Sequence, residues 1–224
     1  MPWSKNTIIF DLDGTLIDTA PDLHAALTHA FESKGLTAID LPTVRSSIGH
    51  GARAMIETSA NVTGISLTDT LLDELHKTFL DYYTSHIADH SAPFPGILDS
   101  LDVCEVRGAT LAVCTNKTQH LAEQVLESLG LIDRFRAIVG ADRTSEKKPS
   151  ATHLLETLSL VGGQLDQAVM IGDSSTDGFA AQAAGMPFIF MTYGYPDDKT
   201  SELKPFKSLG SAEDLPAAIH ECFS

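Results

Sequence analysis

The chain has 224 residues, of which 43% are hydrophobic and 20% are charged, and its formal net charge at pH 7 is −15. This composition is ordinary for a globular protein with one large domain or two modest ones. The acidic balance excludes a general nucleic-acid-binding surface. No apolar run approaches the ~20 residues of a membrane span, so we expect neither a nucleic-acid nor a membrane partner.

Cysteine usage and the N-terminal sequence favour a reducing compartment. The three cysteines (Cys104, Cys114 and Cys222) form no CxxC pair, and an odd number argues against a disulfide framework. The N-terminal residues contain no signal-peptide core. We therefore expect a cytoplasmic protein in which Cys104 and Cys114, which lie in apolar surroundings, are buried and unreactive.

The stretch that organises the chain is a short apolar run followed by two carboxylates. Residues 7–10 (Thr-Ile-Ile-Phe) predict a buried strand, and Asp11 and Asp13 come directly after it. Side chains two residues apart in an extended segment share a face, so both project past the carboxyl end of that strand. Such a pair suits a nucleophile and a general acid/base beside a divalent cation. The alternative is a polar Asp-Gly turn.

The next part of the chain is a helical block. Apolar periodicity and capping residues predict helices over 18–34, 41–48, 51–61 and 67–87, with no strand between them. Because the block follows the first strand directly, we expect an insertion that forms a second, all-helical domain over the carboxyl edge of a sheet. The predicted boundaries are 18–92 for this domain, and 1–17 with 93–224 for the core.

From residue 93 onward, helices and strands alternate. The expected helices are 97–106, 119–129, 151–160 and 174–184, and the expected strands are 110–114, 137–139, 168–171 and 188–191. Nearly continuous apolar strands separated by helices are typical of a parallel, doubly wound α/β sheet. Ligands of such sheets bind at the carboxyl ends of the strands.

Polar residues follow or precede several of these elements. Thr115 and Asn116 follow one strand and suit phosphate oxygens, although helix capping is an equal alternative. Lys148 precedes a proline and a helix, where the alternative is a solvated basic patch. Asp173 and Asp177 follow another strand at a spacing of one helical turn, which suits Mg²⁺; the alternative is a helix N-terminal acidic pair.

The helical block contains one candidate substrate loop. Gly49, His50 and Gly51, with Arg53, are placed to reach the catalytic mouth, where Arg53 or His50 would meet a second anionic group of a substrate. The alternative is a glycine-broken helix junction with a solvated arginine. His86 and His90 have i, i+4 spacing but no third ligand, so surface histidines are the better interpretation.

Taken together, the segments DLDGT at 11–15, TN at 115–116, Lys148 before Pro149 and GDSSTD at 172–177 resemble the haloacid dehalogenase superfamily. Within it, strings such as DGTLIDTAPDL and PFPGI look most like the phosphoglycolate phosphatases. The resemblance implies a Rossmann-like core with an inserted helical cap. It favours a phosphatase over a dehalogenase, because the dehalogenase branch lacks an acid at the position of Asp13.

The resemblance also implies roles for individual residues. Asp11 would be the nucleophile that forms an aspartyl-phosphate, and Asp13 the general acid/base. The Asp11 carboxylate, the Asp13 backbone carbonyl and Asp173 would hold Mg²⁺, with Asp177 behind them. The phosphoryl oxygens would be bound by Thr115, Asn116 and Lys148.

The predicted function is therefore Mg²⁺-dependent hydrolysis of a small phosphorylated metabolite, with 2-phosphoglycolate favoured. The alternatives are a phosphatase or mutase that acts on a nucleoside monophosphate, pyrophosphate or a sugar phosphate, and a non-catalytic protein that binds a phosphorylated ligand. Both a monomer and a homodimer are compatible with the sequence.

Overall fold

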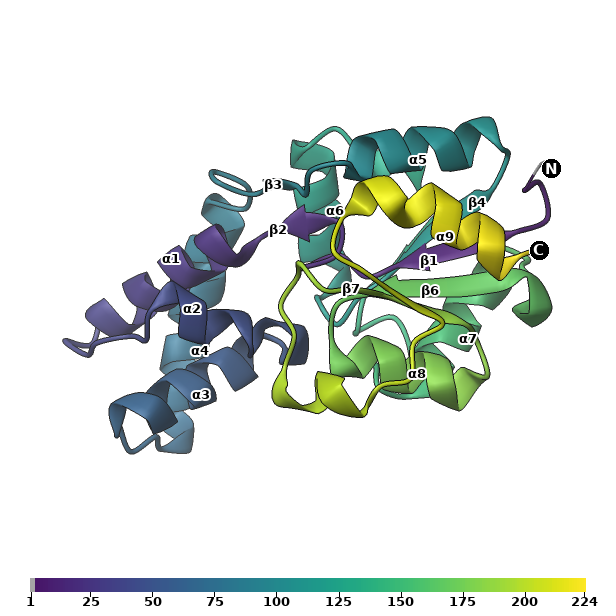
Figure 1. Ribbon diagram of the computed structural model, residues 1–224. Coiled ribbons are helices and arrows are strands. Elements are labelled where there is room, and N and C mark those ends of the chain that lie inside the picture. The colour runs from purple at the N-terminus through teal and green to yellow at the C-terminus, as the bar shows by residue number, and fades with distance from the viewer. Residues whose placement is uncertain (1–2) are drawn as a thin grey trace.

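The computed structural model describes residues 3–224 and contains a six-stranded, fully parallel sheet in the order β5-β4-β1-β6-β7-β8 (Figure 1). The first strand therefore lies in the middle, between β4 and β6, as a doubly wound sheet requires. The strands of this sheet are β1 (Thr7–Phe10), β4 (Thr110–Cys114), β5 (Ala137–Val139), β6 (Ala168–Gly172), β7 (Phe188–Met191) and β8 (Lys207–Leu209).

Helices cover both faces of the sheet, because successive strand residues point to opposite sides. In β1, Ile8 and Phe10 belong to one apolar cluster and Ile9 to another. The first cluster includes residues of α5 (Ile97–Val106), α6 (Gln119–Ser128) and α9 (Leu215–Cys222). The second includes residues of α7 (Ala151–Leu160) and α8 (Ser175–Ala184). The predicted Rossmann-like α/β core is confirmed.

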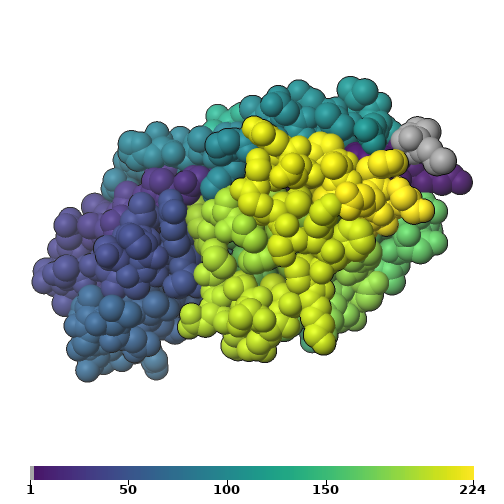
Figure 2. Space-filling model, in the orientation of Figure 1, coloured from purple at the N-terminus to yellow at the C-terminus, as the bar shows by residue number. Residues whose placement is uncertain are grey.

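A separate helical unit lies beyond the carboxyl ends of the strands (Figures 1 and 2). It has its own apolar core, in which Phe31, Ile56 and Phe79 are buried. Its helices are α1 (Ala20–Glu32), α2 (Leu41–Arg45), α3 (Ala52–Thr63) and α4 (Asp69–Ser85). Short 3₁₀ turns occupy Ile48–His50, Ile132–Arg134, Leu165–Gln167, Asp198–Glu202 and Ala212–Asp214. The predicted helical cap is thus present.

The connection between the two units is a short antiparallel ladder that the sequence analysis did not predict. Strand β2 (Ile17–Asp18) pairs with β3 (Ala92–Pro93), so the chain leaves the core and returns to it side by side. For this reason α1 begins at Ala20 and not at Asp18. Thr19 occupies the N-cap position but makes no side-chain capping bond.

Other differences have equally local causes. The predicted helix 41–48 ends at Arg45, and a 3₁₀ turn follows it. Strand β8 and helix α9 were not predicted. Strand β8 has no apolar run, because only Leu209 of its three residues is buried. Within residues 3–224 no helix combines the length and the apolar character needed to cross a bilayer.

Asp22 joins the two ends of the helical unit. This buried carboxylate in the first turn of α1 accepts hydrogen bonds from the backbone N–H groups of His90 and Ser91, and from Ser91 Oγ at 2.6 Å. It therefore ties the start of the insertion to the segment that returns to the core.

Replacement of this carboxylate will lower stability. We expect Asp22→Ala to reduce the free energy of unfolding by about 3 kcal/mol, because it leaves buried donors without an acceptor. Urea unfolding measures the change. The control is Asp133→Ala at an exposed carboxylate, which should change stability by less than about 0.5 kcal/mol. Equal effects of the two substitutions would contradict the proposed tie.

Candidate active site

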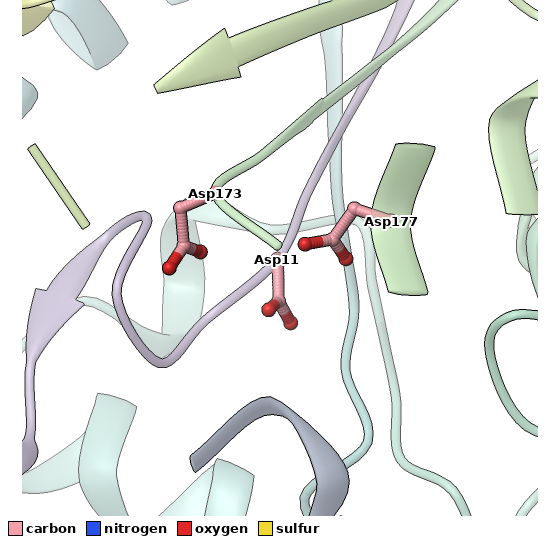
Figure 3. A group of neighbouring side chains, drawn as sticks. All are labelled: Asp11, Asp173 and Asp177. Carbon is pink, nitrogen blue, oxygen red and sulfur yellow. The ribbon is translucent and has the colours of Figure 1, made fainter. Parts of the chain in front are cut away.

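Three carboxylates meet where β1 and β6 end. Asp11 is 5% exposed, Asp173 1% and Asp177 0%, and one ligand oxygen from each lies within 4.8 Å of the others. Figure 3 shows their carboxyl groups turned toward a common space, with Asp11 between the other two. Asp11, Asp173 and Asp177 therefore lie together at one edge of the sheet, where the sequence places them.

One buried lysine partly compensates this negative charge. Lys148 is 1% exposed, and its Nζ donates to Asp177 Oδ1 at 2.6 Å and to the Cys114 carbonyl oxygen at 2.7 Å. The same atom lies 2.9 Å from Asp11 Oδ1, although this contact is not aligned as a hydrogen bond. Burial alone would lower the pKa of Lys148, but Asp11 and Asp177 raise it, so the ammonium form is stabilised.

The single lysine does not offset all the negative charge of the three carboxylates. Burial is the main cause that raises the pKa of Asp11 from 3.8 to about 7; Lys148 opposes this shift, while Asp177 adds to it. Burial, followed by Asp177 and Asp11, also raises the pKa of Asp173 well above its usual value. One lysine among three buried carboxylates thus leaves room for further positive charge.

Asp177 and Asp173 are held by different partners. Asp177 forms a capping box at the start of α8: its Oδ2 accepts from Ser174 N at 3.0 Å and from Ser174 Oγ at 2.6 Å. Asp173 accepts from Thr15 Oγ1 at 2.5 Å and from the Tyr195 N–H at 2.7 Å. Both oxygens of Asp177 are therefore engaged, whereas each oxygen of Asp173 has a single donor.

The residues present fit a divalent cation. Asp11 Oδ1 is buried and, within residues 3–224, accepts no aligned hydrogen bond. Asp11 and Asp173 both retain free lone pairs, and all candidate ligands are carboxylate or carbonyl oxygens. Asp177, whose oxygens bind Lys148 and Ser174, is better suited to support than to direct ligation.

Asp13 lies in a separate environment. Its Oδ1 accepts from Thr19 Oγ1 at 2.6 Å and from Lys117 Nζ at 2.8 Å, and Lys117 also lies 3.1 Å from Oδ2. The Lys117 side chain is 5% exposed, and its ammonium lies 4.8 Å from the centre of the Tyr83 ring in α4. Burial alone would lower the pKa of Lys117, but Asp13 and Tyr83 raise it above its usual value.

Thr115 and Asn116 follow β4, where the sequence analysis put them. The Thr115 hydroxyl accepts a hydrogen bond from the Lys117 N–H at 3.2 Å, and its own proton has no acceptor within residues 3–224. The Asn116 amide donates to Gly49 O and to Lys148 O, both at 3.1 Å. Asn116 therefore joins the cap loop to the loop that carries Lys148.

Of the four predicted cap residues, Gly49, His50 and Gly51 lie near the core or the cavity, whereas Arg53 does not. Gly49 reaches the core, since a Cβ there would lie 3.4 Å from Ser174 Cβ, and Gly51 lines the cavity described below. His50 is half-exposed, with Nε2 3.9 Å from Asp197 Oδ2.

Arg53 does not reach the catalytic mouth. Its guanidinium pairs with Asp73 of α4, and both side chains are exposed. The expectation that Arg53 meets the substrate is therefore corrected: its position at the start of α3 turns it along the helical unit toward α4. His86 stacks on Tyr82, and His90 is exposed; neither belongs to a group of candidate metal ligands within residues 3–224.

A cavity of about 320 Å³ lies between the helical unit and the core, next to Asp13. The core contributes Asp13, Asn116 and Lys117, and the cap contributes mainly apolar side chains. The apolar residues that line it include Leu23, Ile48, Met55, Phe79, Leu80 and Leu121. This cavity is the space into which a group bound at the carboxylates can extend.

Several residues of the site were not predicted. Lys117 follows Asn116 directly, but only the fold shows that it reaches Asp13. Tyr195 was not among the predicted site residues, yet its N–H donates to Asp173 and its hydroxyl donates to Asp18 Oδ1 at 2.5 Å. His153 accepts from the Lys148 N–H at 3.3 Å, and its pKa is lowered to about 4, chiefly by burial.

The comparisons with known proteins agree with this geometry. The family model described as haloacid dehalogenase-like hydrolase matches residues 8–191. The chain belongs to this family. It is 41% identical to a phosphoglycolate phosphatase of Mesorhizobium japonicum, covering 97% of this chain and 96% of that protein. It is 39% identical to a phosphoglycolate phosphatase of Agrobacterium fabrum, covering 95% and 91%.

A solved structure of a predicted phosphoglycolate phosphatase from Haemophilus somnus shares this fold. It superimposes with a TM-score of 0.87 at 27% identity, covering 96% of this chain and 97% of that one. The predicted resemblance, the fold class and the assignment to a family of hydrolases are thereby confirmed.

The raised pKa of Asp11 predicts a pH-dependent stability in metal-free solution. The folded state keeps this proton up to about pH 7, while the unfolded state releases it near 3.8. The folded state binds more protons in between, so this group's contribution to stability falls as the pH rises through that window, and levels off above it. Asp11→Asn removes the penalty and should be more stable than the wild type at pH 8, by on the order of a few kcal/mol.

Urea unfolding in chelator at several pH values between 4 and 8 measures this difference. It should shrink toward zero near pH 4. Asp133→Asn, at an exposed carboxylate, serves as the control and should show no such trend. A difference for Asp11→Asn that stays constant across the pH range would contradict the assignment.

Gly194 allows the close approach that positions Asp173. A Cβ at this residue would lie 2.5 Å from Asp173 Oδ2 and closer still to the Gly14 carbonyl oxygen. We expect Gly194→Ala to displace the Asp173 carboxylate and weaken divalent-cation binding at least ~10-fold, as measured by titration calorimetry. Gly210→Ala is the matched control, because its Cβ would meet nothing closer than Thr192 Oγ1 at 3.8 Å. Unchanged cation affinity of Gly194→Ala would contradict a role for Asp173 as ligand.

Proposed function

We propose that this hydrolase is a Mg²⁺-dependent phosphomonoesterase that acts on a small phosphate ester, 2-phosphoglycolate being the favoured substrate. The observation that carries the proposal is the arrangement of Asp11 and Asp13 at the end of β1. Asp11 lies against Lys148 and two further carboxylates, and Asp13 faces a cavity. Two differently placed carboxylates supply the two functions that stepwise ester hydrolysis requires.

Asp11 is the proposed nucleophile. A carboxylate oxygen of Asp11 attacks the phosphorus atom, the P–O bond to the leaving group breaks, and an aspartyl-phosphate forms. Water then attacks that phosphorus, which releases inorganic phosphate and restores the Asp11 carboxylate. Asp11 has two carboxylate oxygens, so one can face the cation while the other attacks. Among the residues the structure describes, Oδ1 accepts no aligned hydrogen bond, which leaves its lone pairs available for one of these two roles.

Asp13 is the proposed general acid/base. It gives a proton to the leaving alkoxide in the first step and takes one from the attacking water in the second. Thr19 and Lys117 both contact Oδ1, while Oδ2 has only the longer Lys117 contact. Oδ2 is therefore the oxygen that we assign to carry the proton.

Mg²⁺ would be held by the Asp11 carboxylate, the Asp13 backbone carbonyl and Asp173, with Asp177 supporting them. When bound, the ion supplies positive charge that offsets the crowded carboxylates and the charge on the phosphoryl group. Thr15 and the Tyr195 N–H orient Asp173 for this purpose. Asp177 keeps Lys148 in place through the 2.6 Å contact.

Thr115, Asn116 and Lys148 are the proposed phosphate-binding residues. The free proton of the Thr115 hydroxyl is available to a phosphoryl oxygen. The Asn116 amide protons are already donated to two carbonyl oxygens, so its contribution is assigned to the backbone N–H. Lys148 neutralises charge at the nucleophile and at the phosphoryl group.

The substrate preference rests on the relatives. The proteins of M. japonicum and A. fabrum are named phosphoglycolate phosphatases, and each aligns over more than nine-tenths of this chain.

We also propose domain boundaries at 18–92 for the cap and 1–17 with 93–224 for the core, since the β2–β3 ladder lies at both junctions. A cytoplasmic location stays a prediction, with which the three free cysteines agree.

Phosphate release from a panel of esters tests the proposal. The panel contains 2-phosphoglycolate, a nucleoside monophosphate, a hexose phosphate and pyrophosphate, each with Mg²⁺ and with chelator. We expect Mg²⁺-dependent turnover that is highest on 2-phosphoglycolate, and a loss of at least ~1,000-fold in Asp11→Asn. Asp133→Asn, an exposed carboxylate, should retain the activity of the wild type.

The outcomes separate the parts of the proposal. Turnover that peaks on another ester replaces the substrate but keeps the mechanism. Normal turnover by Asp11→Asn excludes the nucleophile assignment. No turnover with any ester supports a protein that binds a phosphorylated ligand without hydrolysing it.

A further inference from the structure

We infer that the cavity beside Asp13 is a leaving-group site for 2-hydroxy acids with an apolar carbon chain, and that Lys117 binds their carboxylate. The inference rests on the proposed function and extends it. The accepted substrates would then be phosphate monoesters of extended or branched 2-hydroxy acids, in addition to the two-carbon ester 2-phosphoglycolate.

The cavity lies where the leaving group must go. It is lined by Asp13, which protonates the leaving oxygen in the proposed mechanism, whereas Asp11, Lys148 and Asp173 are outside its lining. An ester that bridges the two regions has its phosphoryl group at Asp11 and its alcohol portion in the cavity.

Lys117 determines which charge this alcohol portion should carry. Within residues 3–224 it is the one lysine or arginine in the lining, and its side chain is nearly inaccessible to solvent. The two histidines of the lining do not replace it. His76 has a pKa lowered by burial and by Arg53, so it is neutral at pH 7, and His120 is exposed. The ammonium has three N–H groups, and within residues 3–224 its hydrogen-bond acceptors are the two oxygens of Asp13, so one N–H remains for an anionic group of the ligand.

The distance between Lys117 and Asp13 indicates where that anion lies on the ligand. Lys117 Nζ is 3.1 Å from Asp13 Oδ2, the oxygen assigned to carry the proton, so an oxygen that Asp13 protonates is within two hydrogen-bond lengths of the ammonium, roughly 6 Å. A carboxylate on the carbon that bears the ester oxygen falls within this range. A carboxylate at the far end of a longer chain would instead be directed among the apolar cap residues.

Size and polarity then favour more than a two-carbon alcohol. The cavity holds about 320 Å³, the volume of about ten water molecules at ~30 Å³ each. Glycolate offers a single CH₂ group to this space. The lining beyond Lys117 consists largely of apolar side chains, among them Met55, Phe79 and Leu80, which an alkyl substituent would cover and water would not.

The test compares two phosphorylated acids with counterparts that lack the carboxylate. The acids are 2-phosphoglycolate and the phosphate ester of 2-hydroxy-3-methylbutanoic acid; removal of the carboxylate from each gives methyl phosphate and 2-methylpropyl phosphate. With wild-type protein and Mg²⁺, we expect kcat/KM for the branched acid to equal or exceed that for 2-phosphoglycolate. A value more than 10-fold lower would overturn the apolar site.

Lys117→Met tests whether Lys117 binds the carboxylate. The quantity compared is the ratio of kcat/KM for each acid to that for its counterpart without the carboxylate. We expect this ratio to fall about 10- to 100-fold, and Lys117→Arg to restore part of it. If Lys117 only orients Asp13, Lys117→Met would lower kcat/KM equally for the acid and for the ester without the carboxylate, because Asp13 protonates both leaving groups. That outcome would overturn the role of Lys117 in carboxylate binding. Arg143→Met, which removes an exposed cation outside the cavity lining, should leave the ratio unchanged.

A second variant tests the cavity without altering its charge. Ala52 lines the cavity at the start of α3, and Ala52→Phe should lower the ratio of kcat/KM for the branched acid to that for 2-phosphoglycolate about 10-fold. Equal losses for the two acids would overturn the placement of the alkyl group. Failure of the proposed function has a different result, namely that the wild type hydrolyses none of the four esters.

Discussion

The structure depends on the electrostatic cost of three buried carboxylates that share one buried lysine. Lys148 contacts Asp11 and Asp177, and the Lys148 backbone is held by His153 from the next helix. The surplus of negative charge raises the pKa of Asp11 and of Asp173, which is an unfavourable state for a resting protein without further cations. A divalent cation at this site would offset part of that cost. The same charges that destabilise the site therefore favour cation binding.

The sequence predicted the positions of the carboxylates at the strand ends well, because each position depends only on the local order of residues. An apolar run followed by Asp11 or Asp173 places a carboxylate at the carboxyl edge of a parallel sheet, wherever the strand lies in that sheet. Arg53 failed as a prediction because the partner of an exposed side chain is decided by the neighbouring helix, here through Asp73. Lys117 was missed for a different reason: its proximity to Asp13 requires β1 and β4 to be adjacent, which the spacing of residues in the sequence does not encode.

The helical unit is joined to the catalytic groups by more than its two connecting strands. Thr19, at the N-cap position of α1, donates to Asp13, and the Tyr195 hydroxyl accepts from the Ala20 N–H at 3.0 Å. The same tyrosine holds Asp173 through its backbone N–H. A rotation of the cap about β2 and β3 would therefore change the contacts of Asp13 and of Asp173 at the same time.

The link between Thr19 and Asp13 also restricts how this protein can be recombined. Cap units are natural candidates for exchange between relatives, because they enter and leave the core through two adjacent strands. A graft that begins at Asp18 would import a foreign residue in place of Thr19, and with it a different hydrogen-bond partner for Asp13. The exchangeable module therefore starts within α1, after Ala20. Chimaeras cut there keep the contacts of Thr19 with Asp13 and of Ala20 with Tyr195, while the cap side of the cavity comes from another protein.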